Sequence, residues 1–201
     1  MAPPTFTSLP NEVLDEIIQL TLPDGFESLA LTCKEIYGPC TRYIQYHNHL
    51  RSAFRDFAYS GHYPSDPSQG TFYRAFELIM RIADEPRVAQ YIITADFSFD
   101  TLRRQPSAHR RNPLVVPDIN GGGPVVALFA NSTILATAGL DWREFYTKIQ
   151  DQLAQGFYSQ EAASFVLTLL PNVKRFTLPK LWWPLAEHDN TVFWFGAWTQ
   201  K

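Results

Sequence analysis

Charged side chains are scarce in this 201-residue sequence: they make up 18% of it, and the net charge is −3. A protein that binds nucleic acid by neutralising phosphates needs a basic surface, so the composition argues against that class. No run of about 18 apolar residues is present, and we expect no transmembrane helix. The first ten residues lack the basic and apolar regions of a secretory signal. These absences favour an intracellular protein, cytoplasmic or nuclear or both, with no nucleic-acid or membrane partner.

Cysteine is also rare, which limits the metal and redox chemistry that we expect. Cys33 and Cys40 are the two cysteines, and with no nearby histidine pair their spacing fits neither a zinc site nor a disulfide framework. His47 and His49 are two residues apart, so on a helix they point to different sides and are expected to be solvated. The motifs G-x-S-x-G, H-E-x-x-H and C-x-x-C are all missing. We therefore expect no catalytic residue, no metal and no cofactor.

Apolar residues make up 45% of the sequence, enough for a core, and the first clear helical pattern begins at about Pro10. At about 100° per residue, the apolar residues of this segment fall on two faces of a helix. One face holds Val13, Ile17 and Leu20, and the other holds Leu14, Ile18 and Leu22.

Two breaks follow this segment. Residues 23–25, Pro-Asp-Gly, are expected to end the first helix, and Asp24 is expected to cap a second helix over residues 26–31. A third short helix over residues 33–37 is expected to end at the Gly-Pro pair at 38–39. Three short helices cannot cover both apolar faces of the first one, so the remaining apolar surface needs the rest of the chain or another protein to cover it.

The same residues carry a resemblance to a known family. The sequence LPNEVLDEII at 9–18, LP at 22–23 and LALTCKEIY at 29–37 resembles the F-box of many fungal F-box proteins, over roughly the first quarter of the chain. The resemblance implies a three-helix domain that docks on the Skp-family adaptor of a cullin-based ubiquitin ligase. The contact residues that it implies are Leu9, Pro10, Val13, Leu14, Ile17, Ile18, Leu29 and Leu31. The same apolar residues would also suit core positions of an ordinary helical N-terminus.

The rest of the chain reads as a helix over residues 43–59, a loop at 62–70, and two helix-then-strand units. The first unit is a helix from Thr71 to Ala83, a short helical turn at 86–91 and a strand at 92–99. The second unit is a helix at 160–170 and a strand at 173–178. Such recurrence, with parallel strands, is typical of a solenoid in which each unit packs on its neighbours.

The segment LLPNVKRFTLP at 169–179 resembles a turn of the leucine-rich-like regions of fungal F-box proteins. A third unit can begin at Pro184, with a helix over 192–198, where the chain stops. The aromatic residues there indicate a truncated chain, a fragment, or a partner that covers Trp194 and Trp198.

Residues 101–132 between the two units form the least regular part. Four arginines, at 103, 104, 110 and 111, cluster there, and a glycine triplet at 121–123 lacks the GK[ST] of a phosphate-binding loop. We expect a solvated insertion, while a substrate-contacting, phosphate-recognising or nuclear-import surface stays open as an alternative. Asp141 is expected to begin a further helix.

Together these patterns and the resemblance predict a mostly α chain with some β: an N-terminal three-helix F-box followed by a short, irregular leucine-rich-like α/β solenoid with parallel strands, for which truncation at the C-terminus is one open alternative. The expected domains are an F-box at 5–50, a linker helix and loop at 51–70, and a leucine-rich-like region at 71–201 with an insertion at about 101–132. The resemblance implies a non-catalytic substrate-recognition subunit of an SCF-type ubiquitin ligase. Its partners would be the Skp-family adaptor, through it a cullin, and a client protein that the sequence does not identify. The alternative is a stand-alone interaction module that binds the adaptor without ligase activity.

Overall fold

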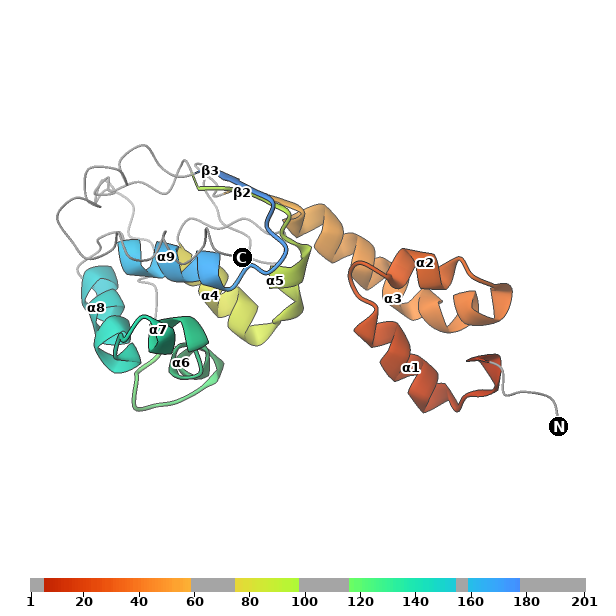
Figure 1. The fold of residues 1–201 in the computed structure, drawn as a ribbon, viewed down its shortest axis with the longest axis horizontal. Coiled ribbons are helices and arrows are strands. Elements are labelled where there is room, and N and C mark those ends of the chain that lie inside the picture. The colour runs from red at the N-terminus through yellow and green to blue at the C-terminus, as the bar shows by residue number, and fades with distance from the viewer. Residues whose placement is uncertain (1–5, 59–74, 98–115, 155–158, 178–201) are drawn as a thin grey trace. The chain divides into compact units, whose positions relative to one another are not determined.

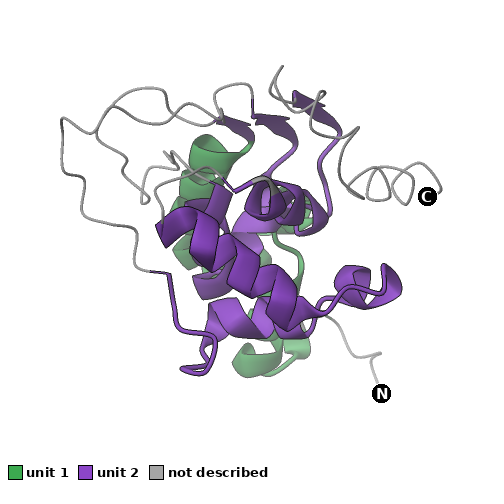
Figure 2. Ribbon diagram, turned by 90° about the vertical axis from the view of Figure 1, so that its left-hand side faces the viewer, with its two compact units in different colours: residues 1–55 green, residues 56–201 purple. Residues whose placement is uncertain are grey.

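The fold was analysed in a computed structural model, which contains two compact units, residues 1–55 (unit 1) and residues 56–201 (unit 2) (Figure 2). Most of what is described is helical, with one small parallel sheet (Figure 1), so the expected mostly α architecture with some β is confirmed. The residues that the structure describes are 6–58, 75–97, 116–154 and 159–177.

Unit 1 is built from helices. Its elements are the 3-10 turn η1 (Phe6–Ser8) and the helices α1 (Asn11–Leu20), α2 (Phe26–Ala30) and α3 (Lys34–Phe54). Helix α1 starts directly after Pro10, whose carbonyl oxygen accepts hydrogen bonds from the amides of Val13 and Leu14. This start agrees with the beginning expected from the proline.

The core of unit 1 lies under one face of α1. Leu14, Ile18 and Leu22 are buried there. They form one cluster with residues from the other two helices, namely Phe26, Ala30, Ile36 and Cys40. Burial of each large aliphatic side chain is worth about 1.5–3 kcal/mol, so this cluster is what holds the three helices together.

The third helix is longer than the sequence predicted. We expected it to end at Gly38-Pro39, but α3 continues through both residues to Phe54. Pro39 cannot donate the backbone hydrogen bond to the carbonyl four residues earlier, which normally breaks a helix. Gly38 removes the Cβ that would clash with the proline ring, and Ile36 and Cys40, four residues apart on one face, are both buried in the core. Packing on both sides of the proline therefore outweighs the lost hydrogen bond.

The expected cap of the second helix is also wrong. Gly25, not Asp24, is the N-cap residue of α2, and no side chain caps this helix. A side chain reaches the free amides of the first turn only from the N-cap position itself, and Asp24 lies one residue too early. The five-residue helix is held by burial of Phe26 and Ala30.

Unit 2 combines a three-stranded sheet with six helices among its described residues. The strands are β1 (Asp56–Ala58), β2 (Thr94–Asp96) and β3 (Arg175–Thr177). The helices are α4 (Ala75–Asp84), α5 (Arg87–Tyr91), α6 (Pro124–Ala130), α7 (Thr133–Thr137), α8 (Trp142–Ala154) and α9 (Gln160–Thr168).

The sheet has the order β1-β2-β3, and both pairs of strands are parallel. The strands predicted within 92–99 and 173–178 are thus confirmed, and they pair in parallel as expected. Strand β1 was not predicted, because residues 43–59 were read as one helix. Phe54 and Phe57 suit a helical stripe, but Phe57 is buried in a strand whose partner, Ala95, lies far along the sequence. The structure therefore places residues 56–58 in unit 2 and not in a linker.

Part of the expected irregular insertion is ordered. Gly123 has a φ of 99°, a conformation that glycine adopts easily, and Pro124 occupies the first turn of α6. Val125, Val126 and Phe129 of this helix are buried. The four arginines of the insertion and the possible third unit after Pro184 lie outside the described residues.

Aromatic side chains form the centre of the helical part of unit 2. The Phe129 ring stacks on Phe165 at a centroid distance of 3.9 Å and meets Tyr146 edge-on at 5.0 Å. Burial raises the pKa of Tyr146 to about 12, with a smaller contribution from Asp118, so its hydroxyl stays protonated. It donates a hydrogen bond to the Pro117 carbonyl oxygen at 2.8 Å, which ties the segment before α6 to α8.

The proline inside α3 generates a testable prediction. Pro39→Ala restores one backbone hydrogen bond and should raise the stability of unit 1 by about 1–3 kcal/mol. Adding Gly38→Ala to this variant should stabilise α3 by a further ~1 kcal/mol, because a Cβ at Gly38 meets open space. Amide hydrogen exchange of α3 in the full chain measures both effects.

The same glycine substitution gives a control in the presence of Pro39. Gly38→Ala alone should stabilise α3 by less than it does in the Pro39→Ala background, since the new Cβ would clash with the proline ring. Equal gains in the two backgrounds would contradict this explanation of how α3 passes the Gly-Pro pair.

Candidate functional site

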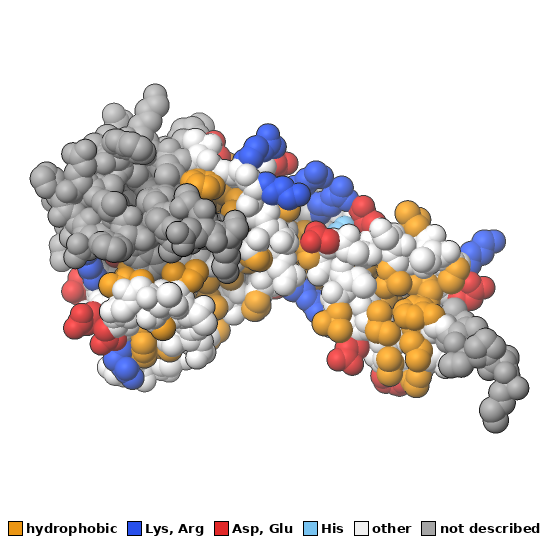
Figure 3. All heavy atoms as spheres, in the orientation of Figure 1, with side chains coloured by type: hydrophobic (Ala, Val, Ile, Leu, Met, Phe, Trp, Pro, Cys, Tyr) orange, Lys and Arg blue, Asp and Glu red, His pale blue; other side chains and the backbone are white. Residues whose placement is uncertain are grey.

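Unit 1 carries most of the exposed large hydrophobic residues in the part of the chain that the structure describes. Of the seven large hydrophobic residues that are exposed among the described residues, five belong to unit 1: Phe6, Val13, Leu20, Leu31 and Tyr37. Figure 3 shows hydrophobic side chains lying together on the face of this unit that is turned to the viewer. Apolar patches of this kind on small domains commonly mark interaction sites.

The geometry of α1 explains why part of this surface remains uncovered. The face with Leu14 and Ile18 is buried in the core, whereas Val13 is 40% exposed and Leu20 is 77% exposed on the other face. Ile17 lies between them and is half-buried. We call Val13, Ile17 and Leu20 the α1 row. The two apolar faces predicted from the sequence are thus present, and the bundle covers one of them.

The eight contact residues implied by the family resemblance fall into three groups. Leu14 and Ile18 are inside the core of unit 1 and have no surface to offer to a partner. Leu9, Ile17 and Leu29 are half-buried, and Pro10, Val13 and Leu31 are exposed, Leu31 at 79%. The resemblance did not mark Leu20, although it shares the α1 row and is among the most exposed apolar residues.

A polar network holds α1 on α3 and so fixes the orientation of the α1 row. The hydroxyl of Tyr43 donates a hydrogen bond to Asp15 Oδ1 at 2.6 Å, and Gln19 Nε2 donates to Asp15 Oδ2 at 3.0 Å. Arg42 forms an ion pair with the same carboxylate, and its guanidinium group lies 5.1 Å from the centre of the Tyr43 ring. One carboxylate on α1 therefore joins three side chains around it.

Helix α2 is anchored to α3 by a second set of contacts. The His47 ring packs on Phe26 with a centroid distance of 4.9 Å, and Nε2 of His47 lies 3.6 Å from Glu27 Oε1. Arg51 forms an ion pair with the same Glu27 carboxylate. We expected His47 to be solvated, but it is buried because it faces α2, whereas His49 is exposed as expected. These contacts position α2, and with it Leu29 and Leu31.

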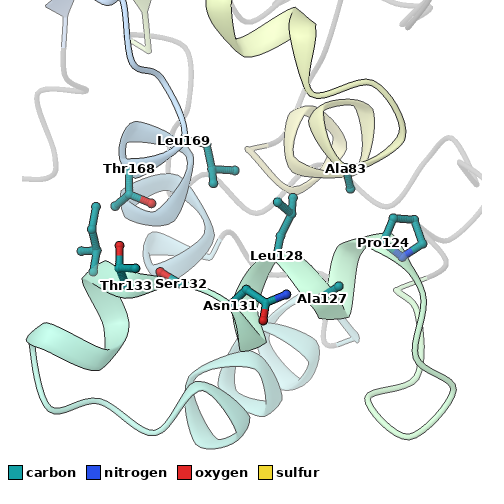
Figure 4. A pocket seen from close by; sticks show the side chains of 10 residues that line it. Ala83, Pro124, Ala127, Leu128, Asn131, Ser132, Thr133, Thr168 and Leu169 are labelled. Atoms are coloured by element: carbon teal, nitrogen blue, oxygen red, sulfur yellow. The ribbon is translucent and has the colours of Figure 1, made fainter.

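Unit 2 carries a groove between α4, α6, α7 and α9, with a volume of about 430 Å³ (Figure 4). Its walls are mostly small and apolar, and none of the lining side chains is charged. The Thr168 hydroxyl donates to the Phe165 carbonyl oxygen at 2.7 Å, and Ser132 Oγ accepts from the Leu135 amide at 3.3 Å. The lining of the groove contains hydroxyl groups but no histidine, lysine or carboxylate that could act on them as a general base.

Other candidate chemistry is limited in the part of the chain that the structure describes. No group of three or more histidine, cysteine or acidic residues there can hold a metal ion. Cys33 is exposed, while burial raises the pKa of the Cys40 thiol. No single described helix is long and apolar enough to cross a membrane. The segments 124–137 and 142–154 reach that length and composition only together, across a bend of 117°.

The position of His47 generates a prediction about pH. Burial is the main influence and lowers the pKa of His47, while the Glu27 carboxylate acts in the opposite direction. Titration of His47 by NMR should therefore give a pKa below the ordinary value of about 6.5. Glu27→Gln should lower it further, and a rise in that variant would contradict the arrangement.

The same shift makes the stability of unit 1 depend on pH. The folded pKa lies below the unfolded one, so the unfolded chain binds more protons at about pH 6 and the free energy of unfolding falls as pH decreases. A tenfold difference between the two acid constants corresponds to about 1.4 kcal/mol. In His47→Phe, which can retain a ring contact with Phe26, this part of the pH dependence should disappear.

The geometry thus leaves two candidate surfaces, the exposed apolar residues of unit 1 and the groove of unit 2. The chain matches no protein-family model, and no curated protein or solved structure is similar enough to count as a match.

Proposed function

We propose that this chain is the substrate-recognition subunit of a cullin-based, SCF-type ubiquitin ligase. Unit 1 binds a Skp-family adaptor through an F-box, and unit 2 holds the client protein. The chain itself is non-catalytic in this role. The observation that carries the proposal is the α1 row, an apolar helix face that the core of unit 1 leaves exposed.

The exposed apolar surface of unit 1 supports binding of a partner. Full burial of a valine or leucine side chain is worth about 1.5–3 kcal/mol. Val13, Leu20 and Leu31 are all exposed at 40% or more, and half-buried Ile17 adds to them. Because these side chains are already partly buried, their summed gain is a few kcal/mol, which offsets part of the roughly 4–15 kcal/mol that association costs.

The motif and the geometry together define the contact set. Of the residues implied by the resemblance, we retain those with accessible surface and add Leu20 from the α1 row. Leu14 and Ile18 support this surface from below, as core residues. The proposed contact residues are Leu9, Pro10, Val13, Ile17, Leu20, Leu29 and Leu31.

The proposal assigns unit 2 as a short leucine-rich-like solenoid. The three strands lie in chain order in one parallel sheet, and each follows a helix in the sequence: α3, α5 and α9. Helix followed by parallel strand is the repeating element of such solenoids. The series begins with β1, one strand earlier than the sequence pattern indicated.

The proposal predicts a loss of adaptor binding when the exposed leucines become charged. Leu20→Asp and Leu31→Asp should each weaken binding of a purified Skp-family adaptor about tenfold or more, because each loses an apolar contact and buries a carboxylate. The matched control is Leu140→Asp, which alters an exposed leucine of unit 2. Calorimetry with the full chain measures the affinities, and circular dichroism checks the fold.

The proposal would be wrong if the adaptor did not bind the full chain, or if Leu20→Asp, Leu31→Asp and Leu140→Asp all bound it equally well. Co-purification of a cullin with the wild-type complex separates a ligase subunit from a stand-alone adaptor-binding protein.

A further inference from the structure

Among the described residues β3 is one of the two edge strands of the sheet, and unlike β1 at the other edge it exposes its central side chain. It pairs with β2 on one side and is the last strand of the sheet formed by the described residues. Its residues Arg175, Phe176 and Thr177 are all exposed, Phe176 at 45%. In β1 and β2 the central residues Phe57 and Ala95 are buried. Parallel sheets are normally covered, so an exposed parallel edge strand with an aromatic residue is unusual.

The backbone of Phe176 faces this open edge. The Thr177 carbonyl oxygen accepts from the amide of Phe97 at 2.8 Å, and the amide of Arg175 donates to the Ile93 carbonyl oxygen at 3.4 Å. Just before the strand, the amide of Lys174 donates to the same Ile93 oxygen at 2.8 Å. Backbone groups of successive residues in a strand point to opposite edges. Since the residues on both sides of Phe176 bond towards β2, its own N–H and C=O point away from the sheet.

The register of the sheet defines three rows of side chains that end at this edge. The central row, Phe57, Ala95 and Phe176, is apolar and lies on one face. On the other face, one row is Asp56, Thr94 and Arg175, and the second is Ala58, Asp96 and Thr177. Residues that lie side by side on neighbouring strands contact each other. The β3 residue at the end of each row therefore favours a side chain of matching chemistry at the same position of an added strand.

The charge at the edge is positive. Lys174 and Arg175 are exposed neighbours, and Arg175 forms no salt bridge within the described residues. A second copy of the chain pairing through β3 would bring two more cations to the same edge, which like-charge repulsion disfavours. An acidic partner strand would instead pair with Arg175.

We propose that the open edge of β3 binds an extended segment of another protein as a fourth strand. The segment carries an acidic residue beside Arg175, an apolar residue beside Phe176 and a small polar residue beside Thr177. Main-chain hydrogen bonds to Phe176 supply affinity, and the three side-chain rows supply specificity. One part of the inference rests on the proposed function: the assignment of this segment to the client protein.

The test uses the full chain without adaptor, so its failure and that of the adaptor-binding proposal are separate results. The probes are two short synthetic peptides, one with Glu-Val-Thr at its centre and one with Lys-Val-Thr. NMR titration of the ¹⁵N-labelled chain should show that the glutamate peptide binds about fivefold more tightly. The amide of Phe176 should become protected from hydrogen exchange at saturation.

A charge reversal identifies the residue responsible for the preference between the two peptides. Arg175→Glu should reverse the preference between the two peptides. Lys174→Glu is the matched control: it makes the same change at the residue that precedes the strand and lies outside the three rows, and should alter the preference much less. Phe176→Pro removes the outward N–H at an edge position that tolerates proline, and should weaken both peptides more than Phe176→Ala does.

Three results would overturn the proposal. The first is the absence of binding, or equal binding of the two peptides to the wild-type chain. The second is an equal effect of Lys174→Glu and Arg175→Glu. The third is protection of the Phe176 amide before any peptide is added, or dimerisation of the free chain through this edge, because the edge would then already be occupied.

Discussion

Unit 1 depends on one mismatch: α1 has two apolar faces, and the small bundle around it can bury one of them. Leu14, Ile18 and Leu22 provide the core that holds the three helices together. The α1 row on the other face remains at the surface, held in place by the polar network around Asp15. Buried and exposed apolar residues thus alternate along α1, so the apolar residues of one motif differ in whether they belong to the core or to the surface.

The local features of the fold could be read from the sequence because their causes are local. The start of α1 after Pro10, the helices α4, α8 and α9, and the strands β2 and β3 follow from periodicity and breakers within short windows. The errors have non-local causes. Helix α3 continues through Pro39 because residues on both sides pack into the core. Strand β1 forms by pairing with β2, which lies more than thirty residues later and outside any short sequence window.

The candidate surface was predictable in its pattern, but not residue by residue. The motif marks Leu14 and Val13 alike, since a sequence pattern records which positions are apolar and not which side of the helix the bundle covers. Leu20 shows the converse, because the helical period placed it on the outer face although the motif does not include it. The burial of His47 was missed for a related reason. His47 and His49 have similar surroundings in the sequence, but on α3 His47 faces α2 and is buried, whereas His49 is exposed.

The turn between α9 and β3 determines which side chains reach the edge of the sheet. Asn172 Nδ2 donates a hydrogen bond to the Gln90 carbonyl oxygen at 2.8 Å, and the Lys174 amide donates to the Ile93 carbonyl oxygen at 2.8 Å. A single inserted residue would exchange the faces of Arg175 and Phe176. During evolution of this chain, selection should therefore remove insertions and deletions from the turn and retain Asn172, whose side chain makes one of these bonds, while substitutions accumulate at the turn's other positions.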